Sequence, residues 1–158
     1  MPFHRMLLLA GFAMRGLCSM LLLAGTATGL DNGLGARPPM GWNSWNLAGC
    51  AINETFFRQT VDALAAQGFA QSGYQYINLD DCWMAKERDA NGKLQPDLVR
   101  FPSGMANLSA YVHAKGLKIG IYEASGGGTC CGFPGTDGLT HSDDDVDLFN
   151  ERDIAFST

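Results

Sequence analysis

The sequence predicts an α/β fold with a parallel sheet, and the spacing of its strand-like runs is the main reason. Short runs of β-forming residues begin near residues 40, 74, 117 and 154. Segments with the apolar periodicity of helices lie between the first three runs. A right-handed crossover through a helix joins parallel strands. We therefore predict about three and a half βα units, which form either the N-terminal half of a (β/α)8 TIM barrel or part of an open doubly wound sheet.

The first 29 residues have the composition of a secretory signal peptide. His4 and Arg5 precede apolar runs over 6–13 and 17–24, and small residues follow. A membrane anchor is the alternative, but neither run approaches the ~20 apolar residues that span a bilayer. We expect residues 1–29 to be a signal peptide and residues 30–158 to be exported, either to the extracellular space or to a lysosome.

Composition and charge exclude several classes of partner. The 158 residues are 46% hydrophobic and 17% charged, an ordinary globular mixture, and the net charge is -5. There is no basic cluster, so we expect neither nucleic acid nor an anionic membrane as a partner. Four cysteines, at 50, 82, 130 and 131, remain after the signal, in a compartment that favours disulfides. Their spacings do not resemble a zinc site, and we expect no metal and no cofactor.

The first βα unit begins with a short strand and its exit at residues 40–45. Trp42 and Trp45 stand on either side of small polar residues there. An indole usually packs into a core, and otherwise it can present an apolar plate to a sugar ring.

A helix is expected to follow, with Asn53 as its N-cap and Glu54 placed to suit the helix dipole. Gly68 is expected to close this helix in a left-handed conformation. Its apolar face repeats at helical spacing and consists of Phe57, Val61, Leu64 and Ala65.

The central strand is the apolar run from Tyr74 to Leu79, which follows Gly73 and is typical of a strand buried on both faces. Two adjacent carboxylates, Asp80 and Asp81, end it. Proteins of the α/β class place ligand chemistry at the carboxyl ends of such strands, because the loops there converge. The plainer alternative is that the two acids only solvate the strand exit and cap a helix.

The loop after Trp83 is nearly twenty residues long, which is more typical of a binding rim than of a connection. Residues 89–92 are expected to form a small turn or hairpin within it. Ser103 is expected to cap the next helix and Gly116 to end it. The expected apolar face of that helix is Met105, Leu108 and Val112.

A third buried strand is predicted over residues 117–122. The glycines that follow, 126–128, lack the Gly-x-Gly-x-x-Gly and Gly-Lys-Ser/Thr spacings, so nucleotide binding is not favoured. The acidic run 143–145 is expected to open a third helix, and residues 154–156 are expected to begin a fourth strand.

Together these segments resemble the α-galactosidases of glycoside hydrolase family 27, a family that also contains α-N-acetylgalactosaminidases. The resemblance covers about residues 37–138 and implies the barrel rather than the doubly wound sheet. Several long blocks in the same order are more specific than any single motif. The matching blocks are 39–45 (PMGWNSW), 73–83 (GYQYINLDDCW), Arg88-Asp89 with Gly92, 101–104 (FPSG), 111–122 (YVHAKGLKIGIY) and Thr129-Cys130 with Gly132.

The resemblance implies a sugar site at the strand ends. Asp80 and Asp81 are expected to hydrogen-bond sugar hydroxyls, including the axial 4-hydroxyl of galactose. Carboxylates suit this role, because each accepts charge-assisted hydrogen bonds of defined direction. Trp45 is the implied stacking plate, Tyr122 lines the pocket floor, and Cys130 lines the site.

The resemblance also implies a disulfide between Cys50 and Cys82, at the first two strand exits. Cys130 matches a cysteine whose partner in the family follows the fourth strand. The sequence departs from the family in two places near the expected site. Ala124 stands where many relatives have an aspartate, and Cys131 stands where a small residue without a thiol is usual. After about residue 138 the match decays.

The implied function is retaining hydrolysis of terminal α-D-galactosyl residues from glycans or glycolipids, and the full-length protein is compatible with a homodimer. In the family, the nucleophile ends the fourth strand and the acid/base follows the sixth. The resemblance therefore implies no catalytic residue within this chain, which we expect to be an incomplete catalytic domain over residues 30–158. The alternatives are an α-N-acetylgalactosaminidase, an inactive galactose-binding remnant and a gene fragment.

Overall fold

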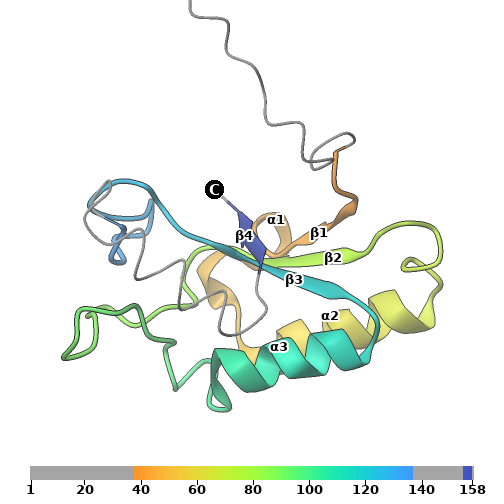
Figure 1. Cartoon of the computed structure of the whole chain (residues 1–158), viewed down its shortest axis with the longest axis horizontal. Helices are drawn as coiled ribbons and strands as arrows, with labels where there is room; N and C mark the ends of the chain where they lie inside the picture. The colour runs from red at the N-terminus through yellow and green to blue at the C-terminus, as the bar shows by residue number, and fades with distance from the viewer. Residues whose placement is uncertain (1–37, 137–154, 158) are drawn as a thin grey trace, which may run out of the picture. The chain divides into compact units, whose positions relative to one another are not determined.

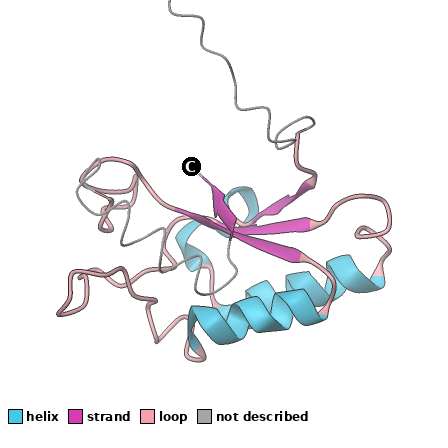
Figure 2. Ribbon diagram, in the orientation of Figure 1, coloured by secondary structure: helices cyan, strands magenta, loops and turns pink. Residues whose placement is uncertain are grey.

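The protein forms a parallel four-stranded sheet with its two longer helices on one side (Figures 1 and 2). The structure is a computed structural model and describes residues 38–136 and the backbone of 155–157. The strands are paired in the order β1-β2-β3-β4. They are β1 (Gly41–Asn43), β2 (Tyr76–Leu79), β3 (Lys118–Tyr122) and β4 (Ala155–Ser157). The predicted alternation of parallel strands and helices is therefore confirmed.

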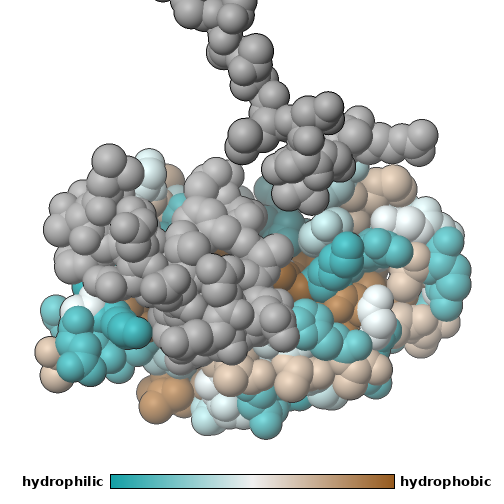
Figure 3. All heavy atoms as spheres, viewed as in Figure 1, coloured by the Kyte–Doolittle hydropathy of each residue, from teal (hydrophilic) through white to brown (hydrophobic). Residues whose placement is uncertain are grey.

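The core lies between the sheet and the helices α2 (Glu54–Ala66) and α3 (Gly104–Ala114). In β2, Ile77 and Leu79 are fully buried, whereas Tyr76 and Asn78 on the other face are half-buried. The expectation of a strand buried on both faces is therefore only half right for β2. Figure 3 shows brown, apolar surface over the strands in the middle of the view. The predicted apolar faces of both helices are buried, at Phe57, Val61, Leu64, Met105, Leu108 and Val112, except that Ala65 is half-buried.

The ends of α2 follow the sequence signals closely. The Phe56 N–H donates to the Asn53 side-chain oxygen at 2.9 Å, so Asn53 is the N-cap as predicted. Gly68 lies just beyond the end of α2 with φ +79°, a left-handed conformation that favours glycine.

The prediction that Ser103 caps α3 is right in position but not in its hydrogen bond. Ser103 stands at the N-cap position, but its side chain makes no cap hydrogen bond. Instead the hydroxyl donates to Glu54 Oε1 at 2.6 Å, because that buried carboxylate is a stronger acceptor in need of donors. Gly116 ends this helix as predicted, with φ +74°.

Two short antiparallel loops extend from the carboxyl ends of β2 and β3. In the first, Met84 bridges Pro96, and the predicted turn over 89–92 is present, closed by the Gly92 N–H donating to the Asp89 carbonyl at 3.0 Å. In the second, Gly128 bridges Pro134. We call these the 84–96 loop and the 128–134 loop.

Two expectations lie outside the described residues: the signal peptide over 1–29 and the helix opened by 143–145. In the part of the chain that is described, none of the helices has the length and apolar character needed to cross a membrane.

Two short helical segments follow β1. They are α1 (Trp45–Ala48) and the 3-10 helix η1 (Gly49–Ala51).

Candidate functional site

Hydrogen bonds around Asp80 join the carboxyl ends of β1 and β2. The Asn43 side-chain amide donates to Asp80 Oδ2 at 2.8 Å, and the Asp80 N–H donates to the Ser44 hydroxyl at 2.9 Å. Ser44 is fully buried, and its own N–H donates to the Asn78 carbonyl at 3.1 Å. The parallel register pairs Asn43 with Asn78, so both strands end at the same edge. Asp80 is half-buried and is thus the more accessible of the two predicted acids.

Asp81 is 2% exposed, and both of its carboxylate oxygens accept hydrogen bonds from backbone groups. The Cys82 N–H donates to Oδ1 at 2.7 Å, and the Cys131 N–H donates to Oδ2 at 3.1 Å. These donors compensate for the burial of the acid. Asp81 therefore holds the 128–134 loop against the exit of β2, and Asp80 fits the role of a ligand-binding carboxylate better.

The backbone at Cys82 is strained. Its φ of +74° is in the left-handed region, where a non-glycine residue costs of order 1–3 kcal/mol. The Arg100 guanidinium donates to the Cys82 carbonyl at 2.6 Å and so helps to hold this conformation. Because of this sharp turn, Asp80, Asp81 and Trp83 lie in different surroundings, although they follow one another closely after the strand.

Tyr122 ends β3 beside the predicted carboxylates and Cys130. Burial raises the pKa of the Tyr122 hydroxyl, and the neighbouring Cys130, Asp81 and Asp80 raise it further. Tyr122 therefore stays a neutral phenol at neutral pH. The Trp83 indole N–H donates to the Tyr122 carbonyl at 2.9 Å, which fixes the end of β3 against the exit of β2. The structure thus brings together four of the predicted site residues, namely Tyr122, Asp80, Asp81 and Cys130.

Trp45 begins α1 next to this network. It is 40% exposed, and its backbone N–H donates to the Asn43 side-chain oxygen at 2.8 Å. The Asn43 side chain consequently links the Trp45 backbone to Asp80. A partly exposed tryptophan at a strand exit that also carries a carboxylate offers an apolar plate for a sugar ring.

The expected disulfide between Cys50 and Cys82 is present, with Cα atoms 5.2 Å apart. It joins η1 to the exit of β2. Cys130 and Cys131 are free thiols, the first exposed and the second half-buried. The sulfur of Cys131 and the two disulfide sulfurs all lie within 4.8 Å of one another. Because two of these three sulfurs are bonded to each other, the group as described does not form a metal site.

Two cations hold the 84–96 loop and the 128–134 loop together. Lys86 Nζ donates to the carbonyls of Cys131 and Gly132 at 3.2 and 3.3 Å and lies 3.5 Å from the centre of the Phe133 ring. Arg88 donates at 2.9 Å to the carbonyl of Gly135, the residue that directly follows the 128–134 loop. The loop that carries Cys130 is therefore positioned by side chains of the long loop after β2.

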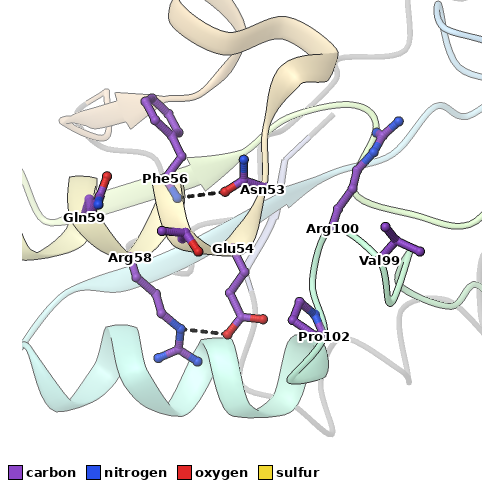
Figure 4. Close-up of a pocket in the computed structure, with 9 residues that line it drawn as sticks. Asn53, Glu54, Phe56, Arg58, Gln59, Val99, Arg100 and Pro102 are labelled. Atoms are coloured by element: carbon purple, nitrogen blue, oxygen red, sulfur yellow. Dashed lines mark hydrogen bonds and ion pairs between the residues drawn. The ribbon is translucent and has the colours of Figure 1, made fainter.

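A hollow of about 650 Å³ lies at the beginning of α2. Figure 4 draws the residues that line it. None of the predicted site residues lines it within the described parts of the chain. Its charged groups bind one another: Arg58 Nε donates to Glu54 Oε1 at 2.8 Å, as drawn in Figure 4. Arg100 pairs with Asp97 at 3.4 Å. The side chains at this hollow therefore connect the beginning of α2 to the segment before α3. The strand exits remain the candidate site.

Sequence reasoning did not single out Asn43, Ser44 or Cys131 as members of the site. Asn43 and Ser44 end a strand within a matching block, so the rule that selected Asp80 could also have selected them. The contact of Cys131 with Asp81 joins residues fifty positions apart and has no local sequence signal.

Comparisons with known proteins agree on one family. The family model described as "Alpha galactosidase A" matches residues 37–157. An alpha-galactosidase of Cyamopsis tetragonoloba is 52% identical over 120 residues, which are 75% of this chain and 29% of that protein. The alpha-N-acetylgalactosaminidase of Gallus gallus is 46% identical over 132 residues, covering 77% and 32% of the two chains. The chain thus spans less than a third of the length of these curated relatives.

Solved structures give the same result. Alpha-galactosidase I of Mortierella vinacea superposes with a TM-score of 0.76 and 34% identity, over 82% of this chain and 33% of that one. The alpha-galactosidase of Saccharomyces cerevisiae with raffinose has a TM-score of 0.74 and 35% identity, over 80% and 28%.

Proposed function

Because the chain belongs to the alpha galactosidase A family, glycoside hydrolase family 27, we propose that its strand exits form the galactose-binding part of an α-galactosidase-type site. The observation that carries this proposal is the placement of Asp80. It is a half-buried carboxylate at the carboxyl end of β2, and it is bonded to Asn43 and Ser44. The Asn43 side chain also accepts from the backbone N–H of Trp45, a residue that is 40% exposed.

The proposed division of roles follows from burial and hydrogen bonding. Asp80 accepts hydrogen bonds from sugar hydroxyls, including the axial 4-hydroxyl, and Trp45 packs against the apolar face of the ring. Tyr122 remains a neutral phenol that can donate or accept, and Cys130 borders the sugar. Asp81 contributes mainly by fixing the 128–134 loop, although each of its oxygens retains a second lone pair.

Binding of the free sugar by the folded chain is the direct test. Galactose should bind more tightly than glucose, its 4-epimer, because glucose lacks the axial hydroxyl for Asp80. A charge-assisted hydrogen bond contributes about 1.5–3 kcal/mol. Asp80→Asn should therefore weaken galactose binding by about 10- to 150-fold in calorimetric titrations.

Asp62→Asn is the matched control, because Asp62 is an exposed acid on α2 that binds Lys115 and Tyr111, far from the strand exits. Its galactose affinity should equal that of the unchanged chain. Circular dichroism checks that each variant is folded. A folded chain that does not distinguish galactose from glucose would contradict the proposal.

We assign binding, and not bond cleavage, to the described residues. The two acids of a retaining glycosidase stand about 5–5.5 Å apart on either side of the scissile bond. Asp80 and Asp81 are adjacent in sequence, and Asp81 is buried by backbone donors, so they do not suit that pair. We expect this chain by itself to release no 4-nitrophenol from the substrate 4-nitrophenyl α-galactoside.

A second ligand is favoured by one specific observation, the match to the alpha-N-acetylgalactosaminidase of Gallus gallus. N-acetylgalactosamine shares the axial 4-hydroxyl of galactose and differs at carbon 2. Tighter binding of N-acetylgalactosamine than of galactose in the same titration would favour the second activity.

Export of the protein is part of the proposal. It is supported by the signal-like composition of residues 1–29 and by the Cys50–Cys82 disulfide, a bond that persists in oxidising compartments. Expression in secreting cells should yield a medium form that begins near residue 30, as read by N-terminal sequencing.

A further inference from the structure

A third sulfur lies beside the Cys50–Cys82 disulfide. The sulfurs of Cys50, Cys82 and Cys131 are all within 4.8 Å of one another, and Cys131 carries a free thiol. A thiolate next to a disulfide can attack one of its sulfurs and replace the other. We propose that Cys131 exchanges with this disulfide, so that the chain interconverts between a Cys50–Cys82 bridge and a Cys82–Cys131 bridge.

The geometry favours attack on Cys82 over attack on Cys50. The Cys131 N–H donates to Asp81 Oδ2 at 3.1 Å, which holds the backbone of Cys131 against the residue that precedes Cys82. Lys86 also holds this backbone, by donating to the Cys131 carbonyl at 3.2 Å. A bond to Cys82 therefore requires little movement of the 128–134 loop.

The leaving group also favours this direction. Cys50 is half-buried, whereas Cys82 is fully buried. A thiolate released at Cys50 is better solvated than one released in the core, because burial disfavours the charged form.

The reaction is balanced within the chain. Cys131 loses its proton to solvent, and its thiolate attacks Cys82 Sγ. The Cys82–Cys131 bond forms as the Cys50–Cys82 bond breaks, and Cys50 leaves as a thiolate that takes up a proton. One disulfide and one thiol are present before and after, so no oxidant or reductant is needed.

The rate should rise with pH. Burial raises the pKa of the Cys131 thiol, the Asp81 carboxylate and Cys130 raise it further, and the Lys86 ammonium opposes them. The thiolate is the attacking species, and its fraction increases about tenfold per pH unit below the pKa. We therefore expect slow exchange at pH 7 and exchange about tenfold or more faster at pH 9.

The test is disulfide mapping of the full chain carrying Cys130→Ser, which removes the adjacent thiol and makes the peptide assignments unique. The protein is held at pH 7 or pH 9, quenched with acid, labelled with N-ethylmaleimide, digested without reduction and analysed by mass spectrometry. We expect Cys82–Cys131 peptides and labelled Cys50 to accumulate faster at pH 9. The rate should not change on tenfold dilution, because the reaction is within one chain.

Cys131→Ser and Cys131→Ala, each added to the same background, are the controls and should keep only the Cys50–Cys82 bridge. Three results would overturn the proposal. One is a Cys50–Cys82 bridge with labelled Cys131 at every time and pH. The second is a Cys50–Cys131 bridge, which reverses the assigned direction. The third is a rate that falls on dilution, which indicates exchange between chains. None of these readouts depends on sugar binding.

Discussion

Glu54 is a buried acid that ties the beginning of α2 to the beginning of α3. Its Oε1 accepts from the Ser103 hydroxyl at 2.6 Å and from Arg58 at 2.8 Å, and its Oε2 accepts from the Ser103 N–H at 3.0 Å. Arg58 continues to the Asn107 side chain of α3 at 2.8 Å. Because Glu54 is 8% exposed, these donors replace the water that it loses on folding.

The stability of the fold should therefore fall in acid. Burial tends to raise the pKa of Glu54, but the hydrogen bonds from Ser103 and the Arg58 charge outweigh it and hold the pKa below its ordinary 4.5. A group with a lowered pKa in the folded state stabilises that state above its unfolded pKa. This stability is lost as the pH falls through the folded pKa.

Glu54→Gln tests this coupling. It should lower the free energy of unfolding by about 1–3 kcal/mol at pH 7, because neighbouring donors lose a charged acceptor. The difference in the free energy of unfolding between this variant and the unchanged chain should narrow as the pH falls below 4.5. Urea unfolding followed by tryptophan fluorescence measures it. Glu87→Gln, which changes an exposed acid of the 84–96 loop, is the control and should have little effect. A difference that stays constant from pH 7 to pH 3 argues against the role of Glu54.

At the scale of elements, β1 reaches β2 closely enough that its first position must be glycine. Gly41 pairs with Tyr76, and a Cβ on Gly41 would overlap the Tyr76 carbonyl oxygen and lie 2.7 Å from the Tyr76 Cβ. These are backbone and Cβ atoms that cannot rotate away. β1 also positions Asn43 and Ser44, so its pairing with β2 sets the geometry around Asp80.

Gly41→Ala should therefore separate β1 from β2. We expect it to lower the free energy of unfolding by about 1–3 kcal/mol or more, as overpacking does, and to weaken galactose binding as well. Gly126→Ala is the matched control, since a Cβ there has no neighbour within 4 Å. Urea unfolding of the two variants measures the difference. Equal stability of both would show that β1 can move away without cost.

At the scale of the whole molecule, the described sheet and helices are the N-terminal part of a (β/α)8 barrel, as the solved relatives show. Strand spacing and apolar periodicity were enough to predict the four parallel strands, because these signals are local. Family resemblance selected the barrel over the open sheet. It also gave the Cys50–Cys82 pair, which the structure contains.

What could not be predicted depends on contacts between distant segments. The Ser103 hydroxyl has a good local use as a cap, but the Glu54 carboxylate, 49 residues away, attracts it more strongly. In the same way, Asp81 looks equivalent to Asp80 in sequence. Only the folded chain brings the Cys131 N–H to Asp81 and buries it, which leaves Asp80 as the accessible acid.

The sheet order has a consequence for the behaviour of this chain in solution. Among the described strands, β1 and β4 each pair with one neighbour only. In β1, the Met40 carbonyl and the Ser44 N–H bond to β2, so the backbone groups of Gly41 and Asn43 face away from it. Such an edge can pair with another chain. We expect the chain purified by itself to self-associate at micromolar concentrations.

Sedimentation velocity over a range of concentrations measures this association, and two substitutions locate it. Met40, 43% exposed, immediately precedes β1, whereas Val99, 93% exposed, lies in the loop before α3. Met40→Lys should reduce self-association, because a lysine beside an edge strand must lose water and repel its copy when edges pair. Val99→Lys adds the same charge at a site remote from the edge and should leave association unchanged. A chain that remains monomeric at every concentration contradicts the expectation, and an equal effect of both lysines would mean that general surface hydrophobicity, and not the edge of β1, drives association.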